Sequence, residues 1–408
     1  MKKPELLVAA GNMEKLKYAF AYGADAVYLG GKEFNLRARA NNFEIDEIEE
    51  AVRYAHNLNK KIYITLNAFS RTNEEKKIKE YLHIFQDFQV DAVIISDPGV
   101  VYLAKKEAPN LNLHLSTQAN TTNDLACKFW KELGIKRIVL ARELSLKEIK
   151  EIVHRNRDLE FEIFIHGAMC ISYSGRCFLS TYMADRDANR GDCAHPCRWK
   201  YAVLEEEKRK GKYMDYEEDE KGAYIFNTND MRLIQNVPDL FDTGVGSFKI
   251  EGRMKSLYYI TCVTRAYRRA FDLAMNSEYT KENVKLLQKE MEMLNNRGYT
   301  RGFYFGEPEA KDYNYRGGFD KIKHFFLAQI LEIREENKVK VLIKNTIRID
   351  DEVEIITPNL YTSNFTKIKN IFDEEEEIYL DEVHCDSEVL LEFDEHVELS
   401  EYSIVRHV

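Results

Sequence analysis

The stretch RIVLARELSLKEIKEIVHRNRDLEFEIFIHG (137–167) contains two short β-rich runs separated by one amphipathic segment. In that segment, SLKEIKEIVHRN (145–156), apolar residues recur three and four apart, as on one face of a helix. Ser145 and Glu148 have the spacing of a capping box, which marks the start of a helix. A strand, a helix and a second strand in this order are typical of a parallel βαβ unit.

Six further β-rich runs of this kind occur along the chain, with amphipathic segments between them. They are LLVAAG (6–11), AVYLGG (26–31), IYITLN (62–67), AVIISD (92–97), LHLSTQ (113–118) and SFKIEGR (247–253). The segments EIDEIEEAVRYAHNLN (44–59) and SLYYITCVTRAYRRAFDLAM (256–275) have clear helical spacing. Eight strand–helix units predict an α/β fold, a (β/α)8 TIM-type barrel whose chemistry lies at the carboxyl ends of the strands.

Two regions depart from a bare barrel. Residues 168–246, between strands seven and eight, are too many for a loop and a helix, so we expect an insertion that rises from the active-site face. Beyond about residue 320, short alternating runs predict a small antiparallel β-barrel. These runs are FFLAQILEI (325–333), KVKVLIKN (338–345), DEVEIIT (351–357), EIYLDEV (377–383) and EVLLEF (388–393). We therefore predict a barrel domain over 1–320, which includes the insertion, and a second domain over 321–408.

The net charge of −10 is distributed unevenly over the 408 residues. Residues 321–408 carry 10 basic and 21 acidic side chains, a net charge of −11, which leaves +1 for residues 1–320. A near-neutral barrel neither demands nor forbids RNA as a partner. The sequence shows no membrane-spanning window and no signal peptide, and its seven cysteines are odd in number, so we expect a cytoplasmic protein without a membrane partner.

Four of the seven cysteines are clustered in the predicted insertion, within HGAMCISYSGRCFLSTYMADRDANRGDCAHPC (166–197). They are Cys170, Cys177, Cys193 and Cys197. Four thiolates suit either a tetrahedral zinc site or an iron–sulfur cluster, and the wide spacing favours the cluster over the tight pairs of structural zinc sites. A zinc site, disulfides and unligated thiols remain the alternatives.

Polar residues at the carboxyl ends of the predicted strands are candidates for the active site. They are Asn67, Asp97, Gln118, Asn120, Arg142, Glu143, His166, Lys249, Glu251 and Arg253. In the last strand, the period of two places Lys249 and Glu251 on the same face, toward the lumen, with Arg253 at the mouth. Such a group can hold an anion while a carboxylate handles a proton, although a purely structural ion pair is an alternative.

Standard hydrolase and nucleotide-binding motifs are absent from the sequence. Cys170 and His166 could form a nucleophile and base, but this would break up the set of four thiols. We therefore do not favour a cysteine nucleophile.

Seven segments together resemble peptidase family U32. They are ELLVAAGN (5–12), GADAVYLGGKEFNLRARA (23–40), HLSTQAN (114–120), KRIVLARELSLKEI (136–149), HGAMCISYSGRC (166–177), RGDCAHPCRW (190–199) and FKIEGRMKS (248–256). The family name reflects a collagenase-like activity of undefined catalytic type. Better-defined members are iron–sulfur proteins that hydroxylate tRNA, ribosomal RNA or ubiquinone without oxygen, and the chain is most similar to the tRNA branch.

The resemblance implies hydroxylation of C5 of the wobble uridine in tRNA, with prephenate as co-substrate and a [4Fe-4S] cluster on Cys170, Cys177, Cys193 and Cys197. Zinc is the alternative metal. The expected catalytic residues are Glu143, His166, Lys249 and Glu251. The expected substrate-binding residues are Arg37, Arg39, Asn67, Gln118, Arg142 and Arg253. A second copy or a divergent family member could act as a partner subunit. The alternative functions are a U32-type protease and a non-catalytic RNA-binding subunit.

Overall fold

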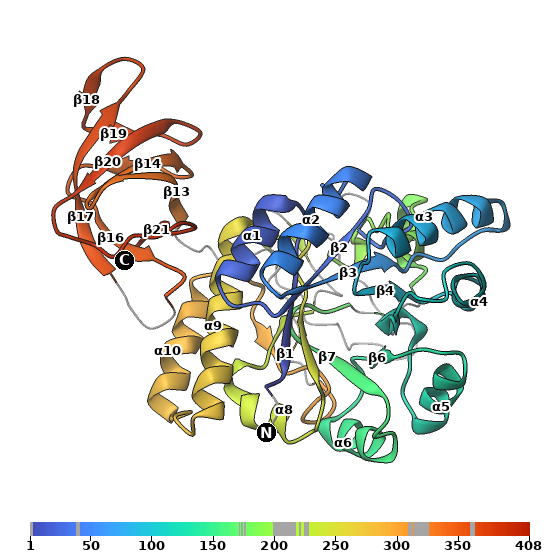
Figure 1. Ribbon diagram of the computed structural model, residues 1–408. Helices are drawn as coiled ribbons and strands as arrows, with labels where there is room; N and C mark the ends of the chain where they lie inside the picture. The colour runs from blue at the N-terminus through green and yellow to red at the C-terminus, as the bar shows by residue number, and fades with distance from the viewer. Residues whose placement is uncertain are drawn as a thin grey trace.

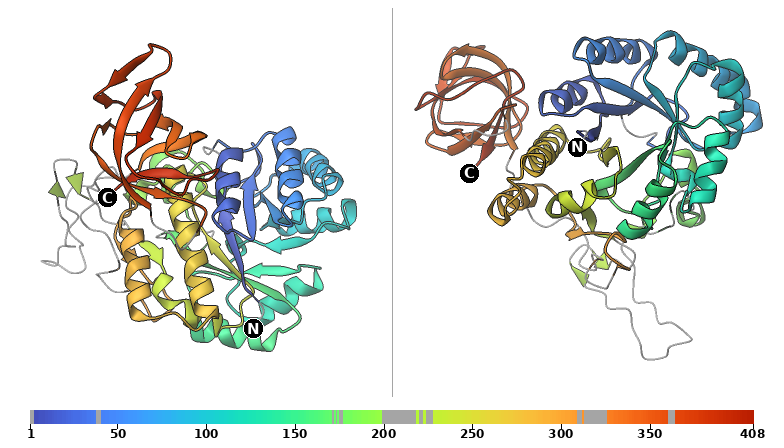
Figure 2. Two further views of the ribbon diagram at one scale, coloured as in Figure 1. Left: turned by 60° about the vertical axis from the view of Figure 1, so that its left-hand side comes forward. Right: turned by 60° about the horizontal axis from the view of Figure 1, so that its bottom comes forward.

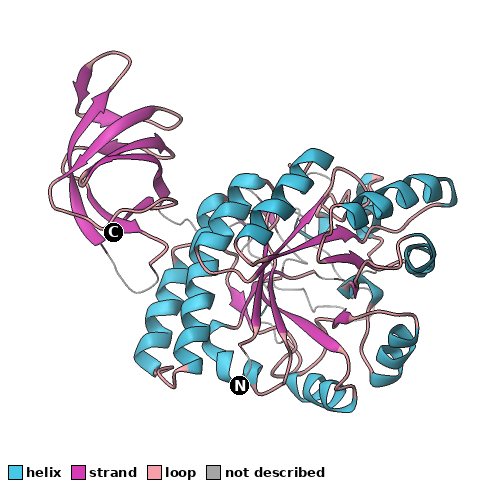
Figure 3. Ribbon diagram, viewed as in Figure 1, coloured by secondary structure: helices cyan, strands magenta, loops and turns pink. Residues whose placement is uncertain are grey.

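The computed structural model describes residues 3–37, 41–170, 172, 174, 177–198, 218–219, 222–223, 228–308, 312, 326–359 and 364–408. Its larger part is a closed barrel of parallel strands surrounded by helices (Figures 1 and 3). The barrel strands are β1 (Glu5–Ala9), β2 (Ala26–Gly30), β3 (Lys61–Leu66), β4 (Ala92–Ile95), β5 (Leu113–Leu115), β6 (Arg137–Val139), β7 (Glu160–Ala168) and β11 (Ser247–Ile250). Each neighbour pairs in parallel, and β11 closes the ring between β7 and β1, so the predicted (β/α)8 barrel is confirmed.

Helices follow the strands along the chain and cover the outside of the barrel (Figure 3). They are α1 (Met13–Ala21), α2 (Ile45–Asn57), α3 (Glu75–Asp87), α4 (Pro98–Glu107), α5 (Asp124–Glu132), α6 (Leu146–Arg155), α8 (Val237–Phe241) and α9 (Leu257–Met275), with α10 (Lys281–Glu292) packed beside α9. The predicted capping box at the start of α6 is present: Glu148 accepts from the Ser145 backbone and Ser145 accepts from the Glu148 backbone.

The alternation of side chains along the strands separates two environments. In β1, Leu6 and Val8 belong to the large apolar core between strands and helices, whereas Leu7 and Ala9 belong to a small cluster inside the barrel. Charged side chains fill much of the remaining lumen, as described below. The barrel interior is therefore a packed core that is closed toward its amino-terminal face.

The segment between β7 and β11 contains the short helix α7 (Leu179–Ala184) and several short strands. These are β8 (Glu218–Asp219), β9 (Gly222–Ala223) and β10 (Asp230–Arg232). Strand β7 runs past the barrel, and its end pairs antiparallel with β10, which pairs in turn with β12 (Tyr299–Thr300). This extension of the sheet forms a wall beside the barrel mouth.

The second domain is a closed antiparallel β-barrel, as predicted. Its strands are β13 (Phe326–Glu335), β14 (Lys338–Ile343), β16 (Glu352–Ile356), β17 (Asn364–Asp373), β20 (Glu388–Phe393) and β21 (Ile404–His407), with β15 (Ile347–Arg348), β18 (Ile378–Leu380) and β19 (Glu382–Val383) beside them. The pairing of β16 with β17 closes the ring. The predicted boundary between residues 320 and 321 lies outside the described residues.

The small domain packs against the amino-terminal helix α1 and the helices α9 and α10 (Figure 2). The Tyr22 hydroxyl contacts the backbone carbonyls of Ile356 and Tyr402 at 2.9 and 3.0 Å, and Gln329 donates to Glu14. The small domain is therefore held against helices from the beginning (α1) and from the end (α9 and α10) of the barrel sequence. Among the described helices, none has the length and hydropathy needed to cross a bilayer.

Candidate functional site at the barrel mouth

A small cavity of about 70 Å³ lies at the carboxyl ends of the barrel strands. Its wall includes seven of the predicted site residues: Arg37, Asn67, Gln118, Arg142, Lys249, Glu251 and Arg253. They come from loops after β2, β3, β5 and β6 and from β11 with the turn that follows it. The strand periodicity and the closed topology thus bring residues more than 200 positions apart to one site.

Lys249 points into the barrel and is almost fully buried. Its ammonium group lies 2.8 Å from Glu162 of the neighbouring strand β7 and 4.2 Å from the centre of the Tyr28 ring. The register explains the pairing, because Lys249 lies directly beside Phe164 and Glu162 is two residues earlier on the same face. Lys249 and Glu251 share the cavity as predicted, but the ion pair of Lys249 is with Glu162.

Glu251 pairs with Arg37 instead, with 3.0 Å between Nη2 and Oε1. Burial alone would raise the pKa of the Glu251 carboxyl, but the Arg37 guanidinium outweighs it and the pKa is lowered. The same contact raises the pKa of Arg37 against the effect of burial. Both groups are therefore charged at neutral pH.

Arg253 and Arg142 supply two positive charges to the cavity. Arg253 is 3% exposed and donates to Thr65 and Asn35, which are neutral. Burial and the nearby Arg37 lower the pKa of Arg253 to about 10, so it is still a cation at neutral pH. Arg142 lies over the Phe164 ring and donates to the Ala168 carbonyl. Within the described residues, neither guanidinium forms an ion pair with a carboxylate.

The amide side chains of Asn67 and Gln118 complete the polar wall. Asn67 donates to the Ser116 hydroxyl at 3.3 Å, and its side-chain oxygen Oδ1 is buried without a hydrogen-bond partner among the described residues. The backbone of Gln118 donates to the same hydroxyl. The sequence did not point to Ser116, to Tyr28 or to Thr65 and Asn35, which accept hydrogen bonds from Arg253. The alternation along the β2 and β3 runs was the available signal for two of them, since Tyr28 and Thr65 have inward-facing positions there.

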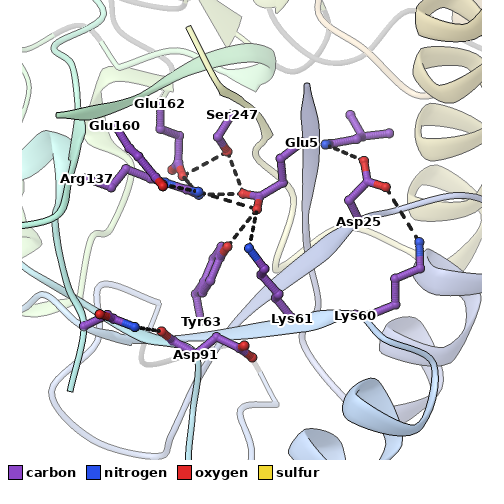
Figure 4. Close-up of polar contacts among 12 residues, drawn as sticks. Glu5, Asp25, Lys60, Lys61, Tyr63, Asp91, Arg137, Glu160, Glu162 and Ser247 are labelled. Carbon is purple, nitrogen blue, oxygen red and sulfur yellow. Dashed lines mark hydrogen bonds and ion pairs between the residues drawn. The ribbon is translucent and has the colours of Figure 1, made fainter. Parts of the chain in front are cut away.

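A layer of charged groups lies beneath the cavity, toward the amino-terminal face of the barrel (Figure 4). Arg137 binds Glu5, Glu160 and Glu162 together, and Ser247 donates to Glu5 and Glu162. Glu162 has no exposed surface. The layer connects Lys249 to the base of the barrel and holds its counter-ion in place. A charged residue within the apolar run FEIFIHG was the sequence signal for it.

His166 and Glu143 lie outside this cavity. His166 is buried among the rings of Tyr259, Tyr267 and Tyr299, and burial lowers its pKa to about 3, so it is neutral. Glu143 accepts hydrogen bonds from the backbone and hydroxyl of Ser174. Glu143 instead lines a second cavity of about 110 Å³, which shares Arg142 with the first. Arg39 lies outside the described residues.

The four clustered cysteines lie in the insertion after β7, and none of them forms a disulfide with another described cysteine. Cys170 is exposed and lines the second cavity, and Cys177, Cys193 and Cys197 are half-buried. Cys193 Sγ lies 3.4 Å from the backbone nitrogen of His195, which donates to it, as is common for sulfur ligands. A donor set of four soft thiols fits a cluster chemically. In the described part of the chain, however, no three potential ligands are arranged around one metal position.

Comparison with known proteins is consistent with this architecture. The model of peptidase family U32 matches residues 11–314, and that of the U32 C-terminal domain matches residues 323–406. The chain belongs to peptidase family U32. This confirms the family predicted from the sequence segments, and the two U32 matches coincide with the parallel barrel and the small antiparallel barrel.

Three relatives are similar to much of the chain. The tRNA hydroxylation protein P1 of Bacillus subtilis is 39% identical over 92% of this chain and 88% of its own. The tRNA hydroxylation protein P of Escherichia coli is 38% identical over 88% of this chain and 87% of its own. The 23S rRNA 5-hydroxycytidine C2501 synthase of E. coli is 37% identical over 66% of this chain but only 39% of its own.

Proposed function

We propose that this U32 protein is an RNA-modifying hydroxylase that acts on C5 of a uridine in tRNA. The observation that carries the proposal is the similarity to two tRNA hydroxylation proteins over nearly the whole of both chains. A relative that modifies C5 of a ribosomal cytidine supports the broader reaction class, hydroxylation of a pyrimidine in RNA. The wobble position is the specific target that we propose.

The charge of the mouth cavity supports prephenate as the co-substrate. Prephenate is a dianion, and a site for it needs two cations that are not already neutralised by the protein. Arg142 and Arg253 meet this requirement, because Arg37 and Lys249 have carboxylate partners in Glu251 and Glu162. Guanidinium groups are well suited to carboxylates, since they can donate two parallel hydrogen bonds. We therefore assign the two carboxylates of prephenate to Arg142 and Arg253.

We assign roles to the remaining residues of the cavity wall from their charge and their position. Glu251 is ionised and can accept a proton from a bound substrate, with Arg37 holding its orientation. Lys249 places a positive charge against developing negative charge at the base of the cavity. Asn67 and Gln118 offer donors and acceptors to the pyrimidine ring or to prephenate. Glu143 lines the second cavity together with Cys170, one of the proposed metal ligands.

We further propose that Cys170, Cys177, Cys193 and Cys197 hold a [4Fe-4S] cluster. When bound, the cluster would supply one-electron redox chemistry beside the mouth. The placement of Cys170 in the cavity that shares Arg142 with the mouth supports a role close to the substrate. If the purified protein contained zinc in place of the cluster, this part of the proposal would be wrong. The proposed RNA substrate does not depend on it.

The function is tested by expressing the chain in a bacterial strain that lacks its own tRNA hydroxylation proteins. Mass spectrometry of tRNA nucleosides should then detect 5-hydroxyuridine or its derivatives with the wild-type chain, and only when prephenate synthesis is intact. Arg253→Ala should abolish the product, whereas Arg157→Ala, on the opposite face of the barrel, should not. Unmodified tRNA in the presence of stably expressed wild-type protein would overturn the proposal.

A further inference from the structure

Two further cavities follow one another beside the mouth cavity. The second cavity, of about 110 Å³, shares Arg142 with the mouth. A third cavity, of about 410 Å³, shares Thr300, Gly302 and Asp312 with the second. Because neighbouring cavities have wall residues in common, the three cavities lie in series, starting from the mouth.

The three cavities differ greatly in size. Sites for small molecules commonly measure about 300–1,000 Å³, whereas the mouth measures about 70 Å³. The mouth is thus too small for two neighbouring nucleotides of an RNA. In an RNA substrate, the nucleotide next to the target must lie elsewhere on the surface, and the third cavity is the largest of the three spaces.

Two stacked pairs of a guanidinium and an aromatic ring line the third cavity. Arg232 of β10 lies over the ring of Tyr299 of β12, 4.2 Å from its centre, and Arg301 lies over the ring of Phe305 at 4.7 Å. Arg301 is exposed and Phe305 is 42% exposed, so the second pair is open to a ligand. Aromatic faces with nearby cations form the surface on which single-stranded nucleic acids bind.

The charges of these arginines are only weakly compensated. Arg301 forms no ion pair within the described part of the chain, and the ion pair of Arg232 is with Glu292, at 3.6 Å. The Glu292 side chain is 63% exposed, so solvent screens this contact. The acidic residues of the cavity are Glu307 and Asp312, and Asp312 accepts the Thr300 hydroxyl. Two guanidinium groups thus remain for a phosphate, and Glu307 can accept from an exocyclic amino group.

We propose that the third cavity binds the nucleotide directly adjacent to the target base, with its base stacked on Phe305 and its phosphate at Arg301 and Arg232. The inference rests on the proposed RNA substrate and adds a second contact site to it. The site holds the single strand in register, so that one base reaches the mouth. It is independent of the prephenate and cluster assignments.

The full-length protein is tested with a fluorescein-labelled anticodon stem-loop of a tRNA that contains the target uridine. Arg301→Ala should weaken binding and reduce the slope of log affinity against log salt concentration by about one, as for a lost phosphate contact. Phe305→Ala should weaken binding about tenfold, within the range for one stacked base. The matched controls are Arg157→Ala and Phe129→Ala, which are exposed residues away from the cavity.

A crosslinking experiment locates the bound nucleotide directly. A stem-loop with 4-thiouridine next to the target should crosslink, on irradiation, to the peptide that contains Phe305. Wild-type protein that modifies tRNA, together with variants that bind as tightly as their controls, would overturn this inference and leave the proposed function intact. Wild-type protein that neither binds nor modifies the RNA would overturn both.

Discussion

Glu162 and Lys249 form an ion pair at the centre of the barrel, 2.8 Å apart, with side-chain exposures of 0% and 5%. Glu162 also accepts from Arg137 and Ser247, so its carboxylate has three partners. Burial of a charge is costly unless it is paired and hydrogen-bonded, and this network meets both conditions. The pair therefore links the stability of the barrel to the position of a cation in the candidate site.

Removal of one member should destabilise the protein strongly. Glu162→Ala leaves Lys249 and Arg137 with one counter-ion fewer, and breaking a buried pair costs about 3–5 kcal/mol. The free energy of unfolding, measured with a chemical denaturant, checks this value. Lys150→Ala removes an exposed pair with Asp242 and should cost less than about 1 kcal/mol. Equal effects of the two substitutions would show that the buried pair contributes no more to the free energy of unfolding than the exposed pair does.

His166 should make the stability depend on pH. Its pKa is about 3 in the folded protein, against about 6.5 in an unfolded chain. Below pH 6.5 the unfolded state binds a proton that the folded state does not, so stability falls as the pH falls toward 3, by about 1.4 kcal/mol per pH unit at most. Above pH 6.5 the effect is absent.

The variant His166→Gln isolates this contribution. The difference in unfolding free energy between wild type and variant should be constant above pH 7 and should shift in favour of the variant as the pH falls. Denaturant titrations at several pH values measure it. His154→Gln, at an exposed position on α6, is the matched control variant. A parallel curve for His166→Gln would mean that the histidine titrates normally in the folded state.

The strands were predictable because each has an apolar run with a turn signal after it, and a closed barrel then fixes which ends meet. The ion-pair partners of the charged residues could not be predicted from the sequence. Arg37 and Glu251 are 214 residues apart, and Lys249 and Glu162 are 87 apart, so their pairing depends on the strand register. The register slips by one residue between Lys249 and Ile250, which no local pattern encodes.

The same limit applies to His166 and to the small domain. The strand period gives His166 the same face as Glu162, but β7 leaves the barrel at its end and the ring of His166 packs against tyrosines outside the cavity.

In the small domain, the strands β17 and β21 were not predicted from the sequence. Polar residues are frequent in the run of β17, and β21 is a run of only four residues whose burial depends on neighbouring strands.

Arg142 provides a test of the anion site. Arg142→Ala should raise the prephenate concentration needed for half-maximal tRNA modification by about ten- to a hundredfold, since a hydrogen bond between charged groups contributes about 1.5–3 kcal/mol. The affinity for an unmodified tRNA transcript in the absence of prephenate should change much less. Arg155→Ala, on the surface of α6, is the control. An unchanged prephenate requirement would exclude Arg142 from the anion site.

The cysteines give the last prediction. If Cys170, Cys177, Cys193 and Cys197 hold a [4Fe-4S] cluster, protein purified without oxygen should be brown and contain about four iron and four sulfide ions per chain. Replacement of any of these four by Ser should lose or destabilise the cluster. Cys127→Ser and Cys262→Ser should keep the colour, because both thiols are buried in helices of the barrel, where burial raises the pKa of each to about 12. Cys385, exposed in the small domain, should also be dispensable. Colourless protein with bound zinc after anaerobic purification would contradict the cluster and the redox chemistry that depends on it.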